Sequence, residues 1–119
     1  MKLYDHDIKR LEEICEYIFD SMADEITVTS LSSLFGISTT TLKRHFRIQF
    51  DKGVHQFITD IRMNKAVWLL VTENKTINEV ALSVGYKDAN SFGRAFKLHF
   101  GVTPLELRNG KKSSNGPFG

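Results

Sequence analysis

Three polar side chains in the stretch 85–104, GYKDANSFGRAFKLHFGVTP, have the types and spacing suited to contacts with DNA. Asn90, Arg94 and Lys97 recur at intervals of four and three, so they share one face of a helix. Arginine can donate two hydrogen bonds to guanine O6 and N7, and asparagine can pair with adenine N6 and N7. Lysine can neutralise a phosphate. The pattern indicates a helix that presents one face to a nucleic acid.

The rest of this helix is aromatic or small. Phe92, Phe96 and Phe100 are four residues apart, which is the spacing of a buried stripe. Ala89 and Gly93 remove bulk from the polar face. Their small size serves either the close approach of a groove edge or the packing of the helix, and the sequence favours neither explanation.

A second copy of the pattern lies fifty residues earlier in the chain. Leu42, Phe46 and Phe50 precede the three phenylalanines of the later stretch by that interval. The same offset relates Arg44 to Arg94, Arg47 to Lys97, Gly53 to Thr103 and Phe57 to Leu107. Because duplication of a motif usually duplicates an operation, the repeat predicts two helices that contact DNA. The polar face of the earlier one consists of Thr39, Thr40, Lys43, Arg44 and Arg47.

Start and stop signals place each of these helices second in a helix-turn-helix pair. In the first pair, Thr29 is expected to cap a short helix that Gly36 ends, and Ser38 to cap the DNA-contacting helix. An amphipathic helix over 7–22 precedes this pair.

The second pair has its own signals. Thr76 and Glu79 form a predicted capping box for a short helix that Gly85 stops, and Asp88 caps the next helix. Thr103 followed by Pro104 predicts a last short helix to about Asn109.

A long apolar pattern without glycine or proline, 54–73, connects the two pairs. A helix of this length measures roughly 30 Å. It could hold the two pairs on one face of a duplex about one helical turn, near 34 Å, apart.

The predicted fold is all-α, with about seven helices and two helix-turn-helix subdomains of homeodomain-like form joined by a long linker helix. The expected divisions are 1–52 for the N-terminal helix and first pair, 53–74 for the linker helix, 75–109 for the second pair and 110–119 for a disordered tail.

Composition fits one small globular domain without a membrane segment. The chain has 119 residues, a net charge of +2 and a single cysteine, Cys15. Its start has no apolar signal region, so a cytoplasmic location is expected. The charge is uneven, with three Lys/Arg against eight Asp/Glu in 1–37 and thirteen against six in 38–119. A basic second part suits a polyanionic partner.

Residues 7–109 resemble the DNA-binding domain of the AraC/XylS family of bacterial transcription regulators. The most specific segment is 77–104, INEVALSVGYKDANSFGRAFKLHFGVTP, which is similar to the family signature almost throughout. The first pair is looser. Asp51 stands where the family has a glycine, Gly53 where it has a serine or threonine cap, and Val54 where it has a proline.

The resemblance implies a sequence-specific regulator, expected to be an activator, that inserts two recognition helices into successive major grooves as a monomer. Double-stranded DNA is the expected partner, RNA polymerase is a second candidate, and no metal or cofactor is expected. The implied base contacts are Thr40, Lys43, Arg44, Ala89, Asn90, Gly93 and Arg94. The implied phosphate contacts are Ser38, Thr39, Arg47, Ser91, Lys97, Gly53 and Thr103.

Two other function classes remain open on the sequence. Some DNA-repair alkyltransferases resemble this family and use a cysteine nucleophile, but Cys15 falls on an apolar face without a nearby base, so no enzymatic activity is expected. A helical protein-interaction module would show no preference among DNA sequences. The histidines lack metal-ligand spacing, and His45 and His99 are expected to be exposed. Target genes, the signal, and whether the chain is a fragment of a larger regulator are not encoded in these patterns.

Overall fold

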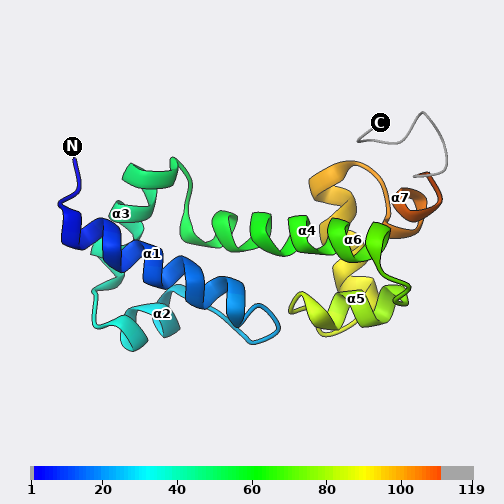
Figure 1. The fold of residues 1–119 in the computed structure, drawn as a ribbon, viewed down its shortest axis with the longest axis horizontal. Helices are drawn as coiled ribbons and strands as arrows, with labels where there is room; N and C mark the ends of the chain where they lie inside the picture. The colour runs from blue at the N-terminus through cyan, green and yellow to red at the C-terminus, as the bar shows by residue number, and fades with distance from the viewer. Residues whose placement is uncertain (1, 111–119) are drawn as a thin grey trace. The chain divides into compact units, whose positions relative to one another are not determined.

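The computed structural model describes residues 2–110, and within them the chain forms seven α-helices and no strand (Figure 1). This confirms the predicted all-α fold. The predicted tail lies outside the described residues, apart from Gly110 at the end of the last helix. The helices are α1 (Asp5–Asp20), α2 (Val28–Phe35), α3 (Thr39–Phe50), α4 (Val54–Thr72), α5 (Ile77–Ser83), α6 (Ala89–Phe100) and α7 (Pro104–Gly110).

The helices belong to two compact units, whose boundary falls inside α4 between Ile61 and Arg62. The first unit contains α1, α2, α3 and the start of α4. The second contains the rest of α4 with α5, α6 and α7. Within the units, α2 packs against α3 and α5 packs against α6, so each unit holds one of the predicted helix-turn-helix pairs.

The first unit buries one face of each of its helices. Its cluster combines residues of α1, α2, α3 and α4, namely Leu11, Ile14, Ile18, Leu31, Leu42, Phe46 and Ile58. His45 is also buried, with 7% of its surface exposed, so the prediction that it is exposed was wrong. It lies three residues after Leu42 and next to Phe46, at the edge of the same buried stripe.

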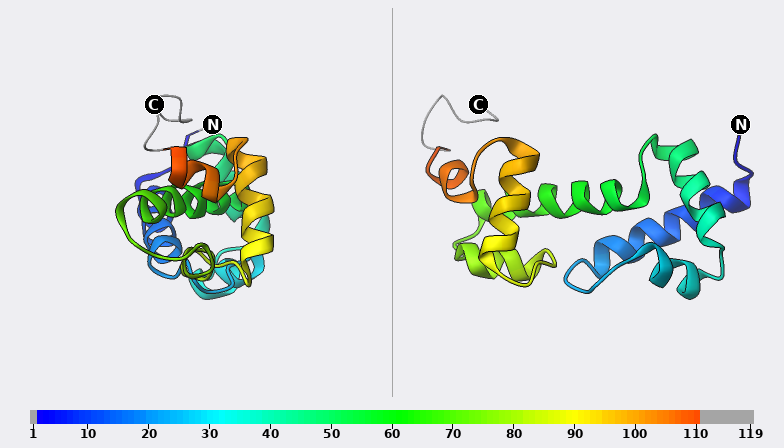
Figure 2. Two further views of the ribbon diagram at one scale, coloured as in Figure 1. Left: turned by 90° about the vertical axis from the view of Figure 1, so that its right-hand side faces the viewer. Right: turned by 180° about the vertical axis from the view of Figure 1, so that it is seen from behind.

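The second unit is built around the phenylalanine stripe of α6. Phe92 and Phe96 have no exposed surface, and the same unit buries Met63, Ala66 and Leu70 of α4 and Val80 and Ala81 of α5. Figure 2 shows α7 beside α6, against which it packs. A hydrogen bond connects α7 to the end of α4, since Arg108 Nε donates to the Leu70 carbonyl oxygen at 3.2 Å.

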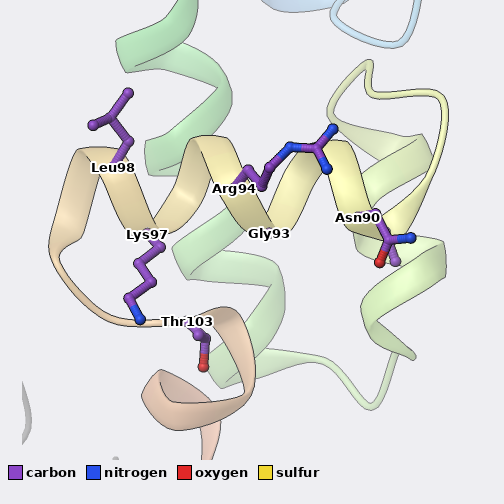
Figure 3. Close-up of a pocket in the computed structure, with 7 residues that line it drawn as sticks. Asn90, Gly93, Arg94, Lys97, Leu98 and Thr103 are labelled. Carbon is purple, nitrogen blue, oxygen red and sulfur yellow. The ribbon is translucent and has the colours of Figure 1, made fainter.

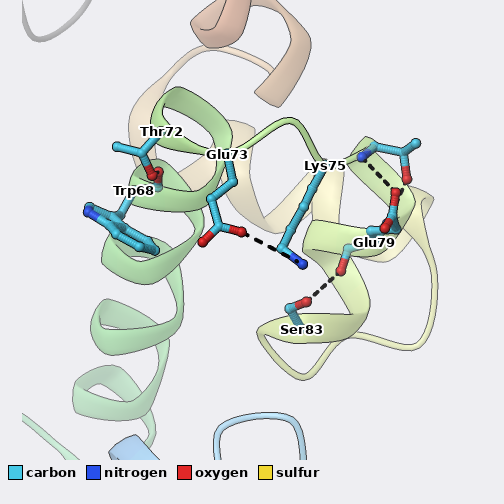
Figure 4. Close-up of polar contacts among 7 residues, drawn as sticks. Trp68, Thr72, Glu73, Lys75, Glu79 and Ser83 are labelled. Carbon is cyan, nitrogen blue, oxygen red and sulfur yellow. Dashed lines mark hydrogen bonds and ion pairs between the residues drawn. The ribbon is translucent and has the colours of Figure 1, made fainter.

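Trp68, the only tryptophan of the chain, lies on the surface of this unit (Figure 4). About half of the side chain, 49%, is exposed. The Lys65 ammonium lies 4.5 Å from the centre of its ring, which is a cation–π contact.

Most of the predicted helix caps are present. Ser38 accepts from the Thr41 amide, Asp88 accepts from the Ser91 amide, and Thr76 forms a reciprocal capping box with Glu79 (Figure 4). Thr103 precedes Pro104 and forms a further box with Glu106.

The predicted cap of α2 was wrong. Thr27, and not Thr29, is the cap, and its hydroxyl accepts from the Ser30 amide at 2.9 Å. The Ser30 hydroxyl in turn accepts from the Thr27 amide at 2.9 Å. Thr29 and Ser30 therefore lie within the first turn of the helix.

A residue in the left-handed conformation lies within two residues of the end of each of α2, α3, α5 and α6. Gly36 has φ 63° and Gly85 has φ 97°, as predicted for their turns. α5 itself ends at Ser83, two residues before Gly85. Asp51 has φ 57° at the end of α3, where Gly101 has φ 81° at the end of α6. Asp51, which stands where the family has a glycine, therefore has the same left-handed conformation as Gly101.

Candidate nucleic-acid interface

The first candidate surface is the exposed face of α3. Leu42 and Phe46 hold the opposite face in the core without any exposed area. The predicted base-contacting residues Thr40, Lys43 and Arg44 are all exposed. Because Lys43 and Arg44 are positively charged and face the solvent, this surface can interact with an anion without losing contacts of its own.

Two predicted phosphate contacts of the first unit lie together at the start of α4. The guanidinium Nη2 of Arg47 lies 3.9 Å from the point that a Cβ on Gly53 would occupy. Gly53 directly precedes α4, whose first amides carry the positive end of the helix dipole. Arg47 and this helix end can therefore act on the same anionic group.

The second candidate surface is the exposed face of α6 (Figure 3). Asn90, Arg94 and Lys97 are exposed, whereas Phe92 and Phe96 are buried on the other side. The Phe92 and Phe96 rings lie 5.5 Å apart between centres. The aromatic stripe thus fixes the rotation of α6 about its axis and leaves the polar stripe outward, as the spacing predicted.

A hollow of about 640 Å³ lies over this face. Figure 3 shows Lys97 and Leu98 directed to opposite sides of α6, with Gly93 further along the helix toward Asn90 and Thr103 near the end of Lys97. The structure thus groups the four predicted base-contacting residues of the second unit with two of its predicted phosphate contacts. The lining residues are Ala89, Asn90, Gly93, Arg94, Lys97, Leu98 and Thr103.

Leu98 is the member of this group that the sequence analysis missed. It has 90% of its surface exposed. It lies four residues after Arg94, as Arg94 lies four after Asn90, so helical spacing alone could have placed it on the same stripe. As an apolar side chain it lacks the hydrogen-bonding groups by which the other members of the stripe were recognised in the sequence.

Carboxylates also lie at the edges of the α6 surface. Hydrogen bonds from the amide and hydroxyl of Ser91 lower the pKa of Asp88, and the charges of Lys87 and Arg94 lower it further. The amide and hydroxyl of Thr103 likewise lower the pKa of Glu106, with a smaller contribution from Lys97. Both carboxyl groups are therefore ionised at neutral pH.

These caps limit how three of the predicted phosphate contacts can act. The Thr103 amide already donates to Glu106 Oε1 at 2.9 Å, and the Ser91 amide donates to Asp88 at 2.7 Å. The Ser38 hydroxyl donates to the Thr41 hydroxyl at 2.9 Å. Lys97 and Arg47 are exposed, so these two cations can reach a phosphate with less rearrangement than the caps require.

The sole cysteine of the chain is unreactive at neutral pH. Burial, followed by the charge of Glu12, raises the pKa of Cys15 to about 11, so its thiol stays protonated at neutral pH. No cluster of three His, Cys, Asp or Glu side chains could hold a metal in this part of the chain. No helix over the same residues is long and apolar enough to cross a membrane.

Comparison with known families gives a match to a helix-turn-helix domain over residues 31–110. The chain is 33% identical over 100 residues to the HTH-type transcriptional regulator MtrA of Neisseria gonorrhoeae, covering 84% of this chain and 33% of that protein. It is 26% identical over 105 residues to the HTH-type transcriptional activator RhaS of Enterobacter sp. (strain 638), covering 88% and 38%. The chain thus spans about a third of the length of these curated relatives.

Solved structures with similar folds include the C-terminal domain of AraT, a response regulator from Geobacillus stearothermophilus. That domain has a TM-score of 0.80 and 29% identity, with 84% of both chains covered. The DNA-binding domain of AdpA, solved in complex with a target DNA, has a TM-score of 0.80 and 22% identity, covering 90% of this chain and 98% of that one. At this identity the likeness to AdpA concerns the fold.

Proposed function

The chain belongs to the AraC family of helix-turn-helix transcription regulators, and from this we propose that it binds double-stranded DNA sequence-specifically, with α3 and α6 as its two recognition helices. Each helix enters one of two successive segments of the major groove. The observation that carries the proposal is that both helices bury an apolar stripe that includes phenylalanine and expose a cationic one. In a helix-turn-helix, the exposed face of the second helix is the one that meets base edges.

Base recognition is assigned to positions in the N-terminal half of each of the two helices. On α6, Asn90 and Arg94 can each make paired hydrogen bonds to a purine, while Ala89 and Gly93 let the helix backbone approach. On α3, Lys43 and Arg44 can donate to guanine, and Thr40 can contact a thymine methyl group or accept a hydrogen bond.

Phosphate contacts are assigned to the ends of these helices. In the first unit, Arg47 and the backbone at Gly53 bind one phosphate. In the second unit, Lys97 and Thr103 bind another. Ser38, Thr39 and Ser91 lie at the first turns of α3 and α6 and complete the set. Such contacts set the register on the duplex and supply affinity that depends on salt.

The proposed role is regulation of transcription by a non-catalytic, monomeric DNA-binding domain, and activation is the direction we favour. The name of RhaS as an activator supports that choice, while MtrA is named only as a regulator. Because bacterial DNA lies in the cytoplasm, this role assigns the protein to that compartment. RNA polymerase is the proposed protein partner, since an activator must reach the transcription machinery.

Site selection from a random duplex library tests the proposal. The purified chain is incubated with the library at moderate salt, and the bound duplexes are sequenced over several rounds. We expect two enriched patches about one helical turn apart, bound by a monomer. Binding without enrichment at any position would contradict sequence-specific recognition and would return the protein-interaction module as the better explanation.

A further inference from the structure

Gly93 lies near the middle of α6, and nothing in the fold requires a glycine at this position. A Cβ added to it would meet no other described atom within 4 Å, and its φ is not in the left-handed region. Neither packing nor backbone geometry therefore requires glycine here, although glycine weakens a helix interior relative to alanine. Of the two explanations that the sequence left open, close approach of something outside the chain is the one that remains.

The surroundings of Gly93 indicate what approaches it. Part of the lining of the hollow is apolar and comes from Ala89, Gly93 and Leu98, while Arg94 and Lys97 add two positive charges. The Leu98 side chain is 90% exposed at the edge of this space. A ligand that fits must combine an apolar projection with a polyanionic frame.

In the major groove, one group has that character. The edges of adenine, guanine and cytosine present polar donors and acceptors, whereas thymine also presents a C5 methyl group. We propose that the hollow over Gly93 accepts the methyl group of a thymine and that Leu98 packs against it. The second unit then selects a T·A pair at this position. This inference rests on the proposed DNA-binding function.

The direct test removes the methyl group from the DNA. Each thymine of the selected site is replaced in turn by deoxyuridine, which keeps the base pair and all of its hydrogen bonds. Loss of one buried methyl group is expected to weaken binding about fourfold, at one or two positions of the patch read by the second unit. Sensitivity at no position would overturn the inference.

A protein variant then locates the methyl group at Gly93. Gly93→Ala adds one methyl group to the hollow, so it should weaken binding to the thymine duplex severalfold. On the duplex with deoxyuridine at the sensitive position it should bind as well as the wild type does, because the added Cβ takes the position against the helix backbone that the thymine methyl group would occupy. Equal losses on both duplexes would place the thymine elsewhere.

Leu98→Ala supplies a second check, with Leu105→Ala as its control. Both leucines are exposed, but Leu105 lies on α7 and does not line the hollow. Leu98→Ala should reduce the discrimination between thymine and deoxyuridine, and Leu105→Ala should preserve it. Equal discrimination in the two variants would remove Leu98 from the contact.

These measurements also distinguish a loss of folding from a loss of DNA binding, and a failure of this inference from a failure of the proposed function. Gly93→Ala should raise the melting temperature by a few degrees, since alanine favours a helix, so weaker binding cannot come from unfolding. A wild-type chain with no sequence preference would contradict the proposed function. A chain that selects a site but ignores the thymine methyl group would contradict only this inference.

Discussion

Loss of the Arg94 side chain should change which sequence is bound. It lies on the exposed face of α6, and its guanidinium can donate two hydrogen bonds to one guanine. Arg94→Ala should lower affinity for the selected site by about 1–3 kcal/mol and relax the preference at one base pair. Competition titrations against single-base variants of the site measure both effects. An unchanged preference would remove Arg94 from base recognition.

Lys97 should act on every sequence alike. It extends toward Thr103 and the connection to α7 (Figure 3), where a phosphate is the proposed partner. Lys97→Ala should weaken specific and random duplexes by the same factor and reduce the slope of log affinity against log salt by about 1. Titrations at several salt concentrations test this. A loss of affinity confined to the selected site would mean that Lys97 contacts a base and not a phosphate.

Asp51 carries a conformational cost that a glycine would avoid. Its φ of 57° is in the left-handed region, and an acidic side chain at a helix C-terminus opposes the helix dipole. Asp51→Gly should therefore raise the free energy of unfolding by about 1 kcal/mol.

The equivalent position of the second unit gives the control for Asp51→Gly. Gly101 has φ 81°, and a Cβ there would meet no other described atom within 4 Å. Gly101→Ala should destabilise for conformational reasons alone. Urea unfolding measures both variants, and a decrease in stability for Asp51→Gly would show that the aspartate makes a compensating interaction.

At the scale of the elements, the second unit depends on carboxylates to begin its short helices. Glu79, Asp88 and Glu106 accept backbone hydrogen bonds at the starts of α5, α6 and α7, and these bonds lower the pKa of each carboxyl group. In the first unit, α2 and α3 are capped by the neutral hydroxyls of Thr27 and Ser38.

This difference predicts a dependence of stability on pH. Because each folded-state pKa is lowered, the stabilisation is complete above the ordinary carboxyl pKa near 4 and is lost as the pH falls through the lowered value. The triple variant Glu79→Gln, Asp88→Asn and Glu106→Gln should lose less stability than the wild type between about pH 5 and pH 3. Thermal unfolding by circular dichroism at several pH values tests this, and parallel losses would contradict it.

Most helix starts were predictable because the interaction that sets them is local and only one residue type nearby can make it. Ser38, Asp88 and the Thr76–Glu79 box each satisfy amides within three residues, so the order of residue types was sufficient. The cap of α2 was not, because Thr27, Thr29 and Ser30 can all accept from a following amide. Burial of Leu31 in the core then fixes which side of the helix faces inward, and this depends on contacts distant in sequence.

The candidate interface likewise has features that the sequence predicted and features that it could not predict. Helical spacing predicted the exposed stripe of Asn90, Arg94 and Lys97, since the phenylalanines determine the opposite face. The hollow was not predictable, because it requires the connection to α7 to bring Thr103 beside α6. His45 was mispredicted for a related reason, as exposure at the edge of a buried stripe depends on which neighbours cover it.

At the scale of the whole molecule, the duplicated arginines should contribute independently. Arg44 and Arg94 belong to different units, each with its own buried core. Arg44→Ala and Arg94→Ala should each relax a different patch of the selected site. Their losses of binding free energy should add to within about 0.5 kcal/mol in the double variant. Titration of the two single variants and the double variant measures this, and both changes affecting one patch would mean that a single unit reads bases.

The position of Trp68 gives this two-unit chain an optical asymmetry. All tryptophan emission comes from the second unit, since the first contains tyrosine and phenylalanine but no tryptophan. Far-ultraviolet dichroism, by contrast, sums the helices of both units. Melting curves recorded by the two signals would separate if one unit unfolded before the other, and would coincide if the continuous helix α4 made unfolding a single transition. The native chain can thus report on its own cooperativity without any attached dye.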